Sequence, residues 1–316
     1  MSEKPEVFLT GATGYIGCQV LKVLVEEGFE VTCAVRRVVT LVPPAKTAMG
    51  SLDAHSDWTG ALQGAAVVIH AAARAHILEK DCSNSLDEFR KVNVAGTLNL
   101  ASQAAQAGVK RFIFISSIGV NGNINKYPFT EDNEPNPAEP YAQSKWEAEQ
   151  GLWGIQRETG MELVIIRPPL VYGPNAPGNF SRLVRWVEKS VPLPLGAIYN
   201  KRSFVALDNL VDLIITCIDH PAAANQVFLA GDGQDISTTE LLRGIGRAIV
   251  KPVRLVPVPA GVLMFGASLL GKKTFALRLL SSLQVDISKA RNLLGWEPPL
   301  SLEEGLRRCF VSEDEC

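Results

Sequence analysis

The sequence predicts an α/β fold, a doubly wound parallel sheet with a smaller C-terminal α/β lobe. Short apolar runs alternate with helical runs through the first part of the chain, and this alternation is typical of βαβ units. The first run, Glu6 to Thr10, leads into a turn with glycines at 11, 14 and 17 and then into an amphipathic run from Cys18 to Glu27. Strand, glycine turn and helix in that order indicate a dinucleotide-binding unit.

The glycine turn is the first candidate binding site. Its first glycine permits a tight turn, its second lets backbone N–H groups approach a pyrophosphate, and its third lets helix and strand pack closely. The alternative is a purely structural turn. On the binding interpretation the sheet is Rossmann-like, and the residues expected to contact the cofactor here are Gly11, Thr13, Gly14, Tyr15, Ile16 and Gly17.

The end of the second predicted strand bears on which nucleotide is bound. This strand, Glu30 to Val35, is followed by Arg36 and Arg37, where an acidic residue would accept a hydrogen bond from the ribose 2′-hydroxyl. Arginine suits a 2′-phosphate, so NADP(H) is favoured and NAD(H) is the alternative. Two surface arginines, one of them stacked on adenine, would look the same in the sequence. Asp53 is a candidate acceptor for the adenine amino group, or else a solvated loop aspartate.

A further buried strand, residues 66–70, is followed by Ala71 and Ala72. Small residues at this position let the backbone approach a cofactor ribose, so both are candidate cofactor contacts. His70 and His76 lie nearby, but no partner motif supports a catalytic role for them.

Tyr141 and Lys145 form the candidate catalytic pair. They are four residues apart at the start of a predicted helix, residues 141–159, so both project from one face. A fixed ammonium beside a phenol is expected to lower the pKa of the tyrosine and to let it exchange a proton with a hydroxyl group. A Tyr-x-x-x-Lys spacing also arises often by chance, so this pair on its own is weak evidence for catalysis.

Ser117 strengthens the catalytic interpretation. It follows a predicted strand, residues 109–115, that comes after a predicted helix, residues 86–107. Parallel sheets bind ligands at the ends of such strands. The loop 119–140 can bring the Ser117 and Tyr141 hydroxyls onto one substrate oxygen, whereas the structural alternative for Ser117 is a strand-end cap.

Composition limits the class of protein. The chain has 316 residues, 47% of them hydrophobic, and a net charge of −2, which argues against a nucleic-acid partner. Six cysteines without paired or metal-ligand spacing indicate a reducing cytoplasm and no metal site. We expect no signal peptide.

The most apolar stretch is 255–270, which contains two prolines and two glycines and is followed by Gly271 and two lysines. It is too short and too broken to span a bilayer. We expect a buried or substrate-lid helix here; the alternative is a helix on a membrane surface.

Five motifs together carry a resemblance. They are Gly11-x-x-Gly14-x-x-Gly17, Ser116-Ser117, Tyr141-x-x-x-Lys145, the run Arg167 to Pro174, and Leu294-Gly295-Trp296-x-Pro298. With them the chain resembles, from end to end, an extended short-chain dehydrogenase/reductase of the NAD(P)-dependent nucleotide-sugar epimerase/dehydratase group. Within that group it is similar to UDP-glucose 4-epimerase-like proteins and UDP-4-keto-sugar reductases of bacterial surface polysaccharide pathways such as O-antigen and lipopolysaccharide biosynthesis.

The resemblance implies roles for individual residues. Tyr141 would be the acid/base, Lys145 would bind the nicotinamide ribose, and Ser117 would hold the sugar oxygen. Pro168 to Val171 would pass beside the nicotinamide, and Asn93 would support the hydrogen bonding of the site. One departure is visible, because Asn121 stands where many relatives have a tyrosine, and this position bears on the shape of the sugar pocket.

Beyond Tyr172 the composition shifts, and a substrate-binding lobe is expected to begin. By resemblance, Asn179 would contact the diphosphate of a sugar nucleotide and Arg202 would hold a nucleotide phosphate; surface ion pairing is the alternative for the arginine. Arg278 and the segment 281–286 are candidates to close over the nucleotide. The pattern predicts a helix over 238–249 and a strand over 253–258. We expect a dinucleotide-binding domain of residues 1–172 with returning segments near 203–230, and a lobe of residues 173–202 and 231–316.

These observations predict an NAD(P)-dependent enzyme that acts at C4 of a UDP-sugar. The favoured reaction is hydride transfer to a UDP-4-keto-hexose. The alternative is a redox-neutral UDP-glucose or UDP-N-acetylglucosamine 4-epimerase with tightly held NAD, and a non-catalytic dinucleotide-sensing protein is a third interpretation. By resemblance, the two predicted helices 86–107 and 141–159 are candidates for a four-helix interface of a homodimer.

Overall fold

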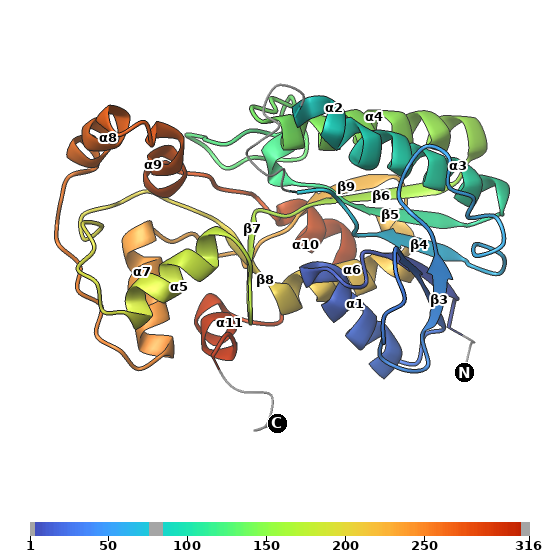
Figure 1. Ribbon diagram of the computed structural model, residues 1–316, viewed down its shortest axis with the longest axis horizontal. Helices are drawn as coiled ribbons and strands as arrows, with labels where there is room; N and C mark the ends of the chain where they lie inside the picture. Colours follow the sequence, from blue (N-terminus) through green and yellow to red (C-terminus); the bar gives the residue numbers. More distant parts are fainter. Residues whose placement is uncertain (1–3, 76–84, 311–316) are drawn as a thin grey trace.

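The computed structural model describes residues 4–75 and 85–310 and has a seven-stranded sheet at its centre (Figure 1). The strand order is β3-β2-β1-β4-β5-β6-β9, and every pair of neighbours is parallel. The strands are β1 (Val7–Thr10), β2 (Val31–Val35), β3 (Lys46–Met49), β4 (Val67–His70), β5 (Arg111–Ile115), β6 (Glu162–Arg167) and β9 (Gln226–Leu229). The order reverses between β1 and β4, where doubly wound sheets bind their ligands.

Helices cover both faces of this sheet (Figure 1). One face carries α1 (Tyr15–Glu26), α6 (Leu207–Asp219) and α10 (Ser288–Leu294). The other carries α2 (Ser85–Phe89), a π-helical segment (Arg90–Gly96), α3 (Thr97–Gln106) and α4 (Pro140–Thr159). Because both faces are covered, the central strands are largely apolar, as buried parallel strands require. The predicted doubly wound α/β fold is confirmed.

A smaller lobe lies beside the carboxyl ends of the strands (Figure 1). It has its own apolar core, to which α5 and α7 contribute. A two-stranded parallel sheet of β7 and β8 leads into it. The elements are β7 (Leu170–Tyr172), α5 (Asn179–Glu188), β8 (Phe204–Ala206), α7 (Thr238–Ala248), α8 (Ala260–Leu269), α9 (Lys273–Leu280) and α11 (Leu302–Arg308). Among the described residues, no helix is long and apolar enough to cross a membrane.

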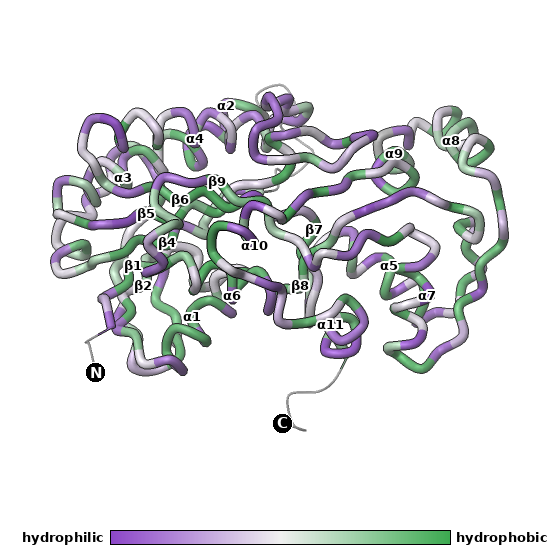
Figure 2. The backbone as a smooth tube through the Cα atoms, turned by 180° about the vertical axis from the view of Figure 1, so that it is seen from behind, coloured by the Kyte–Doolittle hydropathy of each residue, from purple (hydrophilic) through white to green (hydrophobic). Residues whose placement is uncertain are grey.

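The structure corrects two expectations about the lobe. Residues 253–258 form no strand; the segment makes only an isolated bridge between Leu193 and Leu255, since Pro257 and Pro259 have no N–H to extend a ladder. Helix α8 is not a buried helix, because none of its residues is buried; a substrate lid and a membrane-surface helix both stay predictions for it. Figure 2 shows hydrophobic residues both along the central strands and along α8, and Val262, Phe265 and Leu269 of α8 are exposed.

Candidate active site

The glycine turn is packed so tightly that side chains are excluded. A Cβ on Gly11, whose φ is +79°, would lie 2.7 Å from the backbone nitrogen of Ala72, and one on Gly17 would lie 2.1 Å from the carbonyl oxygen of Gly11. Helix α1 begins directly after this turn, and no side chain caps its first N–H groups. These N–H groups are free to bind an anion at the positive end of the helix. The turn therefore fits the pyrophosphate of a dinucleotide.

The residues predicted for the adenosine end lie at the ends of the neighbouring strands. Arg36 and Arg37 follow β2 and are exposed. Asp53 lies in a loop, where one carboxylate oxygen accepts hydrogen bonds from the backbone nitrogens of His55 and Ser56, both at 2.9 Å. These bonds, the one from His55 first, lower the pKa of Asp53. The second carboxylate oxygen remains available, so an adenine contact by Asp53 stays a prediction.

The candidate catalytic residues converge at the ends of β5 and α4. Pro140 opens α4, where a proline costs no hydrogen bond, and Tyr141 follows it. The Tyr141 ring packs edge-on against that of Phe89, with 5.9 Å between centroids. Ser117 lies two residues after the end of β5, and its Oγ accepts a hydrogen bond from the backbone nitrogen of Gly119 at 3.1 Å. Its hydroxyl proton is therefore free to be donated to a ligand.

Burial changes the proton affinities of the pair. It raises the pKa of Tyr141 to about 12 and lowers that of Lys145 to about 7, a drop that the negative charge of Glu149 partly opposes. The expected lowering of the Tyr141 pKa is therefore wrong for the protein without ligands. Desolvation penalises the phenolate and the ammonium alike, and Lys145 is only partly charged at neutral pH.

Lys145 lies in an apolar setting. Its side chain is 1% exposed, and Nζ is 3.9 Å from the centroid of the Phe114 ring. Within residues 4–75 and 85–310, the structure provides no hydrogen-bond acceptor for this nitrogen. A buried ammonium with free donors is suited to bind polar groups of a ligand, and a ribose hydroxyl is of this kind.

The low pKa of Lys145 predicts a pH-dependent stability. Its folded pKa lies below the unfolded value, so folding releases protons and the free energy of unfolding rises with pH between about 7 and 10.5. We expect Lys145→Met to exceed the wild type in unfolding free energy at pH 6, by at least ~1 kcal/mol, and to lose this advantage towards pH 10. Urea unfolding at both pH values measures it. The exposed Lys110→Met is the control; an equal effect there, or none at position 145, would contradict the prediction.

Asn93 holds the segment after β4 against α4. Its amide donates to the Ser144 hydroxyl at 3.0 Å and to the carbonyl oxygen of Arg74 at 3.0 Å, and it accepts from the Arg74 backbone nitrogen at 2.8 Å. Ser144 in turn donates to the Tyr141 carbonyl oxygen at 2.7 Å. Asn93 therefore fixes the start of α4 without touching the Tyr141 side chain.

His70 has a structural position. Its ring nitrogens lie 2.7 Å from Thr10 Oγ1 and 2.9 Å from Thr97 Oγ1. Burial first, and the charge of Lys145 second, lower its pKa to about 3, so the ring is neutral at all ordinary pH values. His76 lies outside the described residues.

A cavity of about 250 Å³ opens beside Ser117 and Tyr141. Pro168 and two arginines from the lobe, Arg202 and Arg278, also line it, so residues far apart in the sequence meet here. Burial lowers the pKa of Arg202 to about 10, which leaves it cationic at neutral pH. The cavity offers two hydroxyls and two cations to a single ligand.

Three residues predicted for the nicotinamide and sugar-nucleotide contacts, Lys145, Val171 and Asn179, are not among the described residues that line this cavity. Val171 lies in β7 and packs against the core of the large sheet. Asn179 is the first residue of α5 and is half-buried. The structure thus brings Arg202 and Arg278 to the catalytic hydroxyls, while contacts of Val171 or Asn179 with a ligand stay predictions.

The sequence analysis missed two acidic residues at the site. Glu139 lines the cavity, and its Oε1 accepts hydrogen bonds from Arg278 Nη2 at 2.6 Å and from Asn123 Nδ2 at 3.2 Å. Its position directly before Pro140 and Tyr141 was the signal in the sequence that could have placed Glu139 near the site. Glu149 lies two turns after Tyr141 on α4, is fully buried and pairs with Arg167 at 2.5 Å. Only its spacing of four from Lys145 pointed to it.

Comparison with known proteins identifies the family of this chain. The model of the NAD dependent epimerase/dehydratase family matches residues 7–231. The chain belongs to this family. A UDP-glucose 4-epimerase of Vibrio cholerae is 47% identical to it over 307 residues, covering 96% of this chain and 93% of that protein.

Solved structures agree with this family. The UDP-glucose 4-epimerase of Thermotoga maritima with UDP-glucose has a TM-score of 0.77 at 25% identity and covers 96% of this chain and 97% of its own. UDP-glucuronic acid 4-epimerase of Bacillus cereus in complex with NAD has a TM-score of 0.77 at 21% identity, covering 96% of both chains; this second likeness is one of fold.

The predicted resemblance is thereby confirmed at the level of the family. The chain is an enzyme of the NAD-dependent epimerase/dehydratase family within the short-chain dehydrogenase/reductase superfamily. The relatives favour the 4-epimerase, which the sequence analysis kept as its alternative, over the 4-reductase that it placed first.

Proposed function

We propose that this enzyme is a UDP-hexose 4-epimerase that interconverts UDP-glucose and UDP-galactose with a retained nicotinamide nucleotide. The observation that carries the proposal is the cavity in which the Ser117 and Tyr141 hydroxyls and the cationic Arg202 and Arg278 meet. A UDP-hexose needs both features, a proton acceptor at one sugar hydroxyl and cations for its diphosphate. The 47% identical Vibrio cholerae UDP-glucose 4-epimerase supports this choice.

Tyr141 moves the proton in this proposal. As its phenolate it accepts the proton of the sugar C4 hydroxyl while C4 is oxidised, and after the 4-keto sugar has turned over it returns the proton when C4 is reduced on the other face. Ser117 donates its free hydroxyl proton to the same sugar oxygen, which positions it and stabilises developing negative charge. The bound nucleotide supplies a hydride acceptor that later acts as donor. Since the hydride comes back, no nucleotide is consumed.

The remaining site residues position the two ligands. Lys145 donates to the nicotinamide ribose, and its ammonium form favours the Tyr141 phenolate. Arg202 and Arg278 bind the diphosphate. Arg202 is already held in place by donating from Nη1 to the carbonyl oxygen of Ser281 at 3.0 Å. Asn179 at the start of α5, and the 281–286 segment that follows α9, complete the nucleotide contact.

We also infer a cellular setting. The enzyme works in the cytoplasm and supplies UDP-hexose to sugar transferases of surface polysaccharide assembly. It pairs as a homodimer through the helices of residues 86–107 and 141–159, which lie side by side on one face of the sheet.

A labelling experiment tests the proposed reaction. Purified enzyme with UDP-glucose carrying deuterium at C4 is expected to form UDP-galactose that keeps the deuterium at C4, without added NADPH, as seen by mass spectrometry and NMR. Loss of the label to water would contradict hydride return. Consumption of NADPH with a UDP-4-keto-6-deoxy sugar, without interconversion of UDP-glucose and UDP-galactose, would make the enzyme a 4-reductase.

The two arginines after β2 give a separate prediction about the nucleotide. If Arg36 and Arg37 bind a 2′-phosphate, replacing both by alanine removes charge-assisted bonds. NADPH affinity is then expected to fall roughly tenfold or more, with little change for NADH, as measured by titration calorimetry. Equal losses for both nucleotides would contradict 2′-phosphate recognition and favour NAD(H) as the retained cofactor.

A further inference from the structure

Helix α8 exposes apolar side chains to water, although their burial would stabilise the fold. Val262, Phe265 and Leu269 are 60%, 68% and 73% exposed, and Leu270, directly after the helix, is 74% exposed. The helix contains no charged residue, and none of its residues is buried. An exposed apolar patch on this scale indicates an interaction surface.

An apolar groove continues this surface. It has a volume of about 510 Å³ and lies between α8, α9 and the segment after α5. Leu193, Val262, Leu263, Phe275 and Leu279 are among its lining residues, and within the described part of the chain Lys272 is its single charged one. The groove is therefore suited to an apolar ligand.

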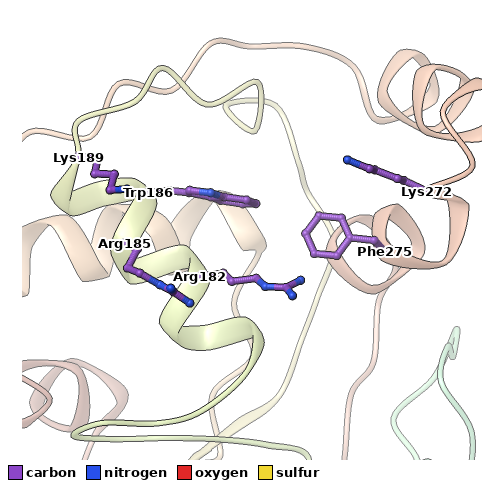
Figure 3. Close-up of a pocket in the computed structure, with 6 residues that line it drawn as sticks. All are labelled: Arg182, Arg185, Trp186, Lys189, Lys272 and Phe275. Atoms are coloured by element: carbon purple, nitrogen blue, oxygen red, sulfur yellow. The ribbon is translucent and has the colours of Figure 1, made fainter. Parts of the chain in front are cut away.

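A cluster of cations borders the groove. Arg182, Arg185 and Lys189 lie on one side of α5, and Lys272 lies just before α9; together they line a second hollow of about 560 Å³. Figure 3 shows these basic side chains around Trp186 and Phe275, and none of the described residues that line this hollow is acidic.

The basic and apolar parts are one surface. Trp186, Lys272 and Phe275 line both hollows. The Trp186 and Phe275 rings meet edge to face with 6.3 Å between centroids, and the Arg182 guanidinium carbon lies 5.9 Å from the Phe275 centroid. We call this the α5–α8–α9 surface. An apolar helix, an aromatic border and a row of cations in this order are the features of a helix that lies in a membrane interface.

We propose that the α5–α8–α9 surface docks the enzyme on an anionic phospholipid bilayer. The exposed side of α8 enters the acyl boundary, the Trp186 ring lies at the level of the headgroups, and the four cations bind lipid phosphates. A ten-residue helix is too short to span the bilayer, so the attachment is peripheral and reversible. This inference does not depend on the proposed epimerase reaction.

The charge pattern selects the bilayer over a second copy of the chain. A twofold interface would place this surface on itself, and would bring Arg182, Arg185, Lys189 and Lys272 of both copies together without acidic partners among the lining residues. An anionic bilayer provides both the apolar phase and the counter-charge.

Docking would also bring the substrate cavity near the membrane. Helix α9 contributes Phe275, Ala276 and Leu279 to the groove, and the same helix carries Arg278, which lines the cavity beside Tyr141 and bonds to Glu139. The active site and the membrane-facing groove are thus on two sides of one short helix.

Vesicle flotation of the full chain tests the proposal. We expect co-flotation with vesicles of phosphatidylcholine and phosphatidylglycerol at low salt, and release at high salt or with phosphatidylcholine alone. Arg185→Glu with Lys189→Glu, and separately Phe265→Ser with Leu269→Ser, are each expected to lower the bound fraction roughly tenfold. Epimerase turnover of the unbound enzyme should be unchanged in both.

Matched variants elsewhere on the protein control for charge and hydropathy. Lys110→Glu with Arg157→Glu reverses two exposed cations, and Val250→Ser with Leu293→Ser removes two apolar side chains that are 89% and 39% exposed. Both should float like the wild type. If the wild type does not float with anionic vesicles, or if the control pairs lose flotation as much as the test pairs, the proposal is wrong. A dimer that dissociates only in Phe265→Ser with Leu269→Ser, without flotation of the wild type, would assign the surface to a second copy.

Discussion

Tyr141→Phe is expected to lower kcat about 10²- to 10⁴-fold while KM for UDP-glucose changes little. The substitution removes only the phenolic oxygen that exchanges the C4 proton in the proposed reaction. The ring keeps its edge-on contact with Phe89, so the fold and the cavity should persist. Coupled measurement of UDP-galactose formation, together with thermal unfolding, separates the two effects.

Tyr127→Phe is the matched control, since this tyrosine is 83% exposed and the same atom is removed far from any buried contact. It should retain full turnover. Unchanged kcat in Tyr141→Phe would exclude Tyr141 as the acid/base and would direct attention to Glu139, the carboxylate that lines the same cavity.

Glu149→Leu is expected to destabilise the protein by about 3–5 kcal/mol. Glu149 accepts from the Ser116 hydroxyl and pairs with Arg167 through two bonds, at 2.5 and 3.0 Å. Arg167 also donates to Asn121 Oδ1 at 3.0 Å. Because these groups are buried, removing the carboxylate leaves a guanidinium without its counter-charge at the junction of β5, α4 and β6.

The neighbouring Glu147 on the same helix gives a direct comparison. It pairs with Arg90 at 2.6 Å, but both side chains are partly exposed, so Glu147→Leu should cost less than ~1 kcal/mol. Denaturant unfolding measures both variants. Glu149→Leu combined with Arg167→Leu should recover much of the loss; a single-site cost no larger than that of Glu147 would contradict the buried pair.

The prediction of the cofactor side of the site rests on local patterns, for a physical reason. The turn from Gly11 to Gly17 is built from contiguous residues, and its close approaches are set by backbone geometry that only glycine permits. The spacing of Tyr141 and Lys145 is likewise fixed by one helix. The fold prediction, which the structure confirms, rests in the same way on the local alternation of strands and helices.

The parts that could not be predicted depend on distant partners. Strand β3, residues 46–49, is an edge strand whose residues are mostly exposed. Its sequence therefore lacks the apolar run that marks a buried strand. The apolar run of α8 predicted burial, because hydropathy reports the cost of exposure and cannot say which surface is available to cover a helix. Glu149 and Arg167 are eighteen positions apart and meet only through the packing of α4 on the sheet.

The domain boundaries drawn from the sequence stay a prediction. The change in composition after Tyr172 coincides with the departure of the chain from the large sheet. β8 and α6 then return it towards that sheet, where β9 pairs with β6.

The pairing of Arg202 has a consequence for the order in which the protein matures during synthesis. Its backbone bridges to Ile236 and Leu283, and its side chain bonds to the carbonyl oxygen of Ser281. In a chain emerging from the ribosome, every strand of the large sheet is therefore translated before Ser281 and Leu283, two of the residues that hold Arg202. A nascent chain stopped before position 281 would contain every strand of that sheet and an unfinished substrate cavity.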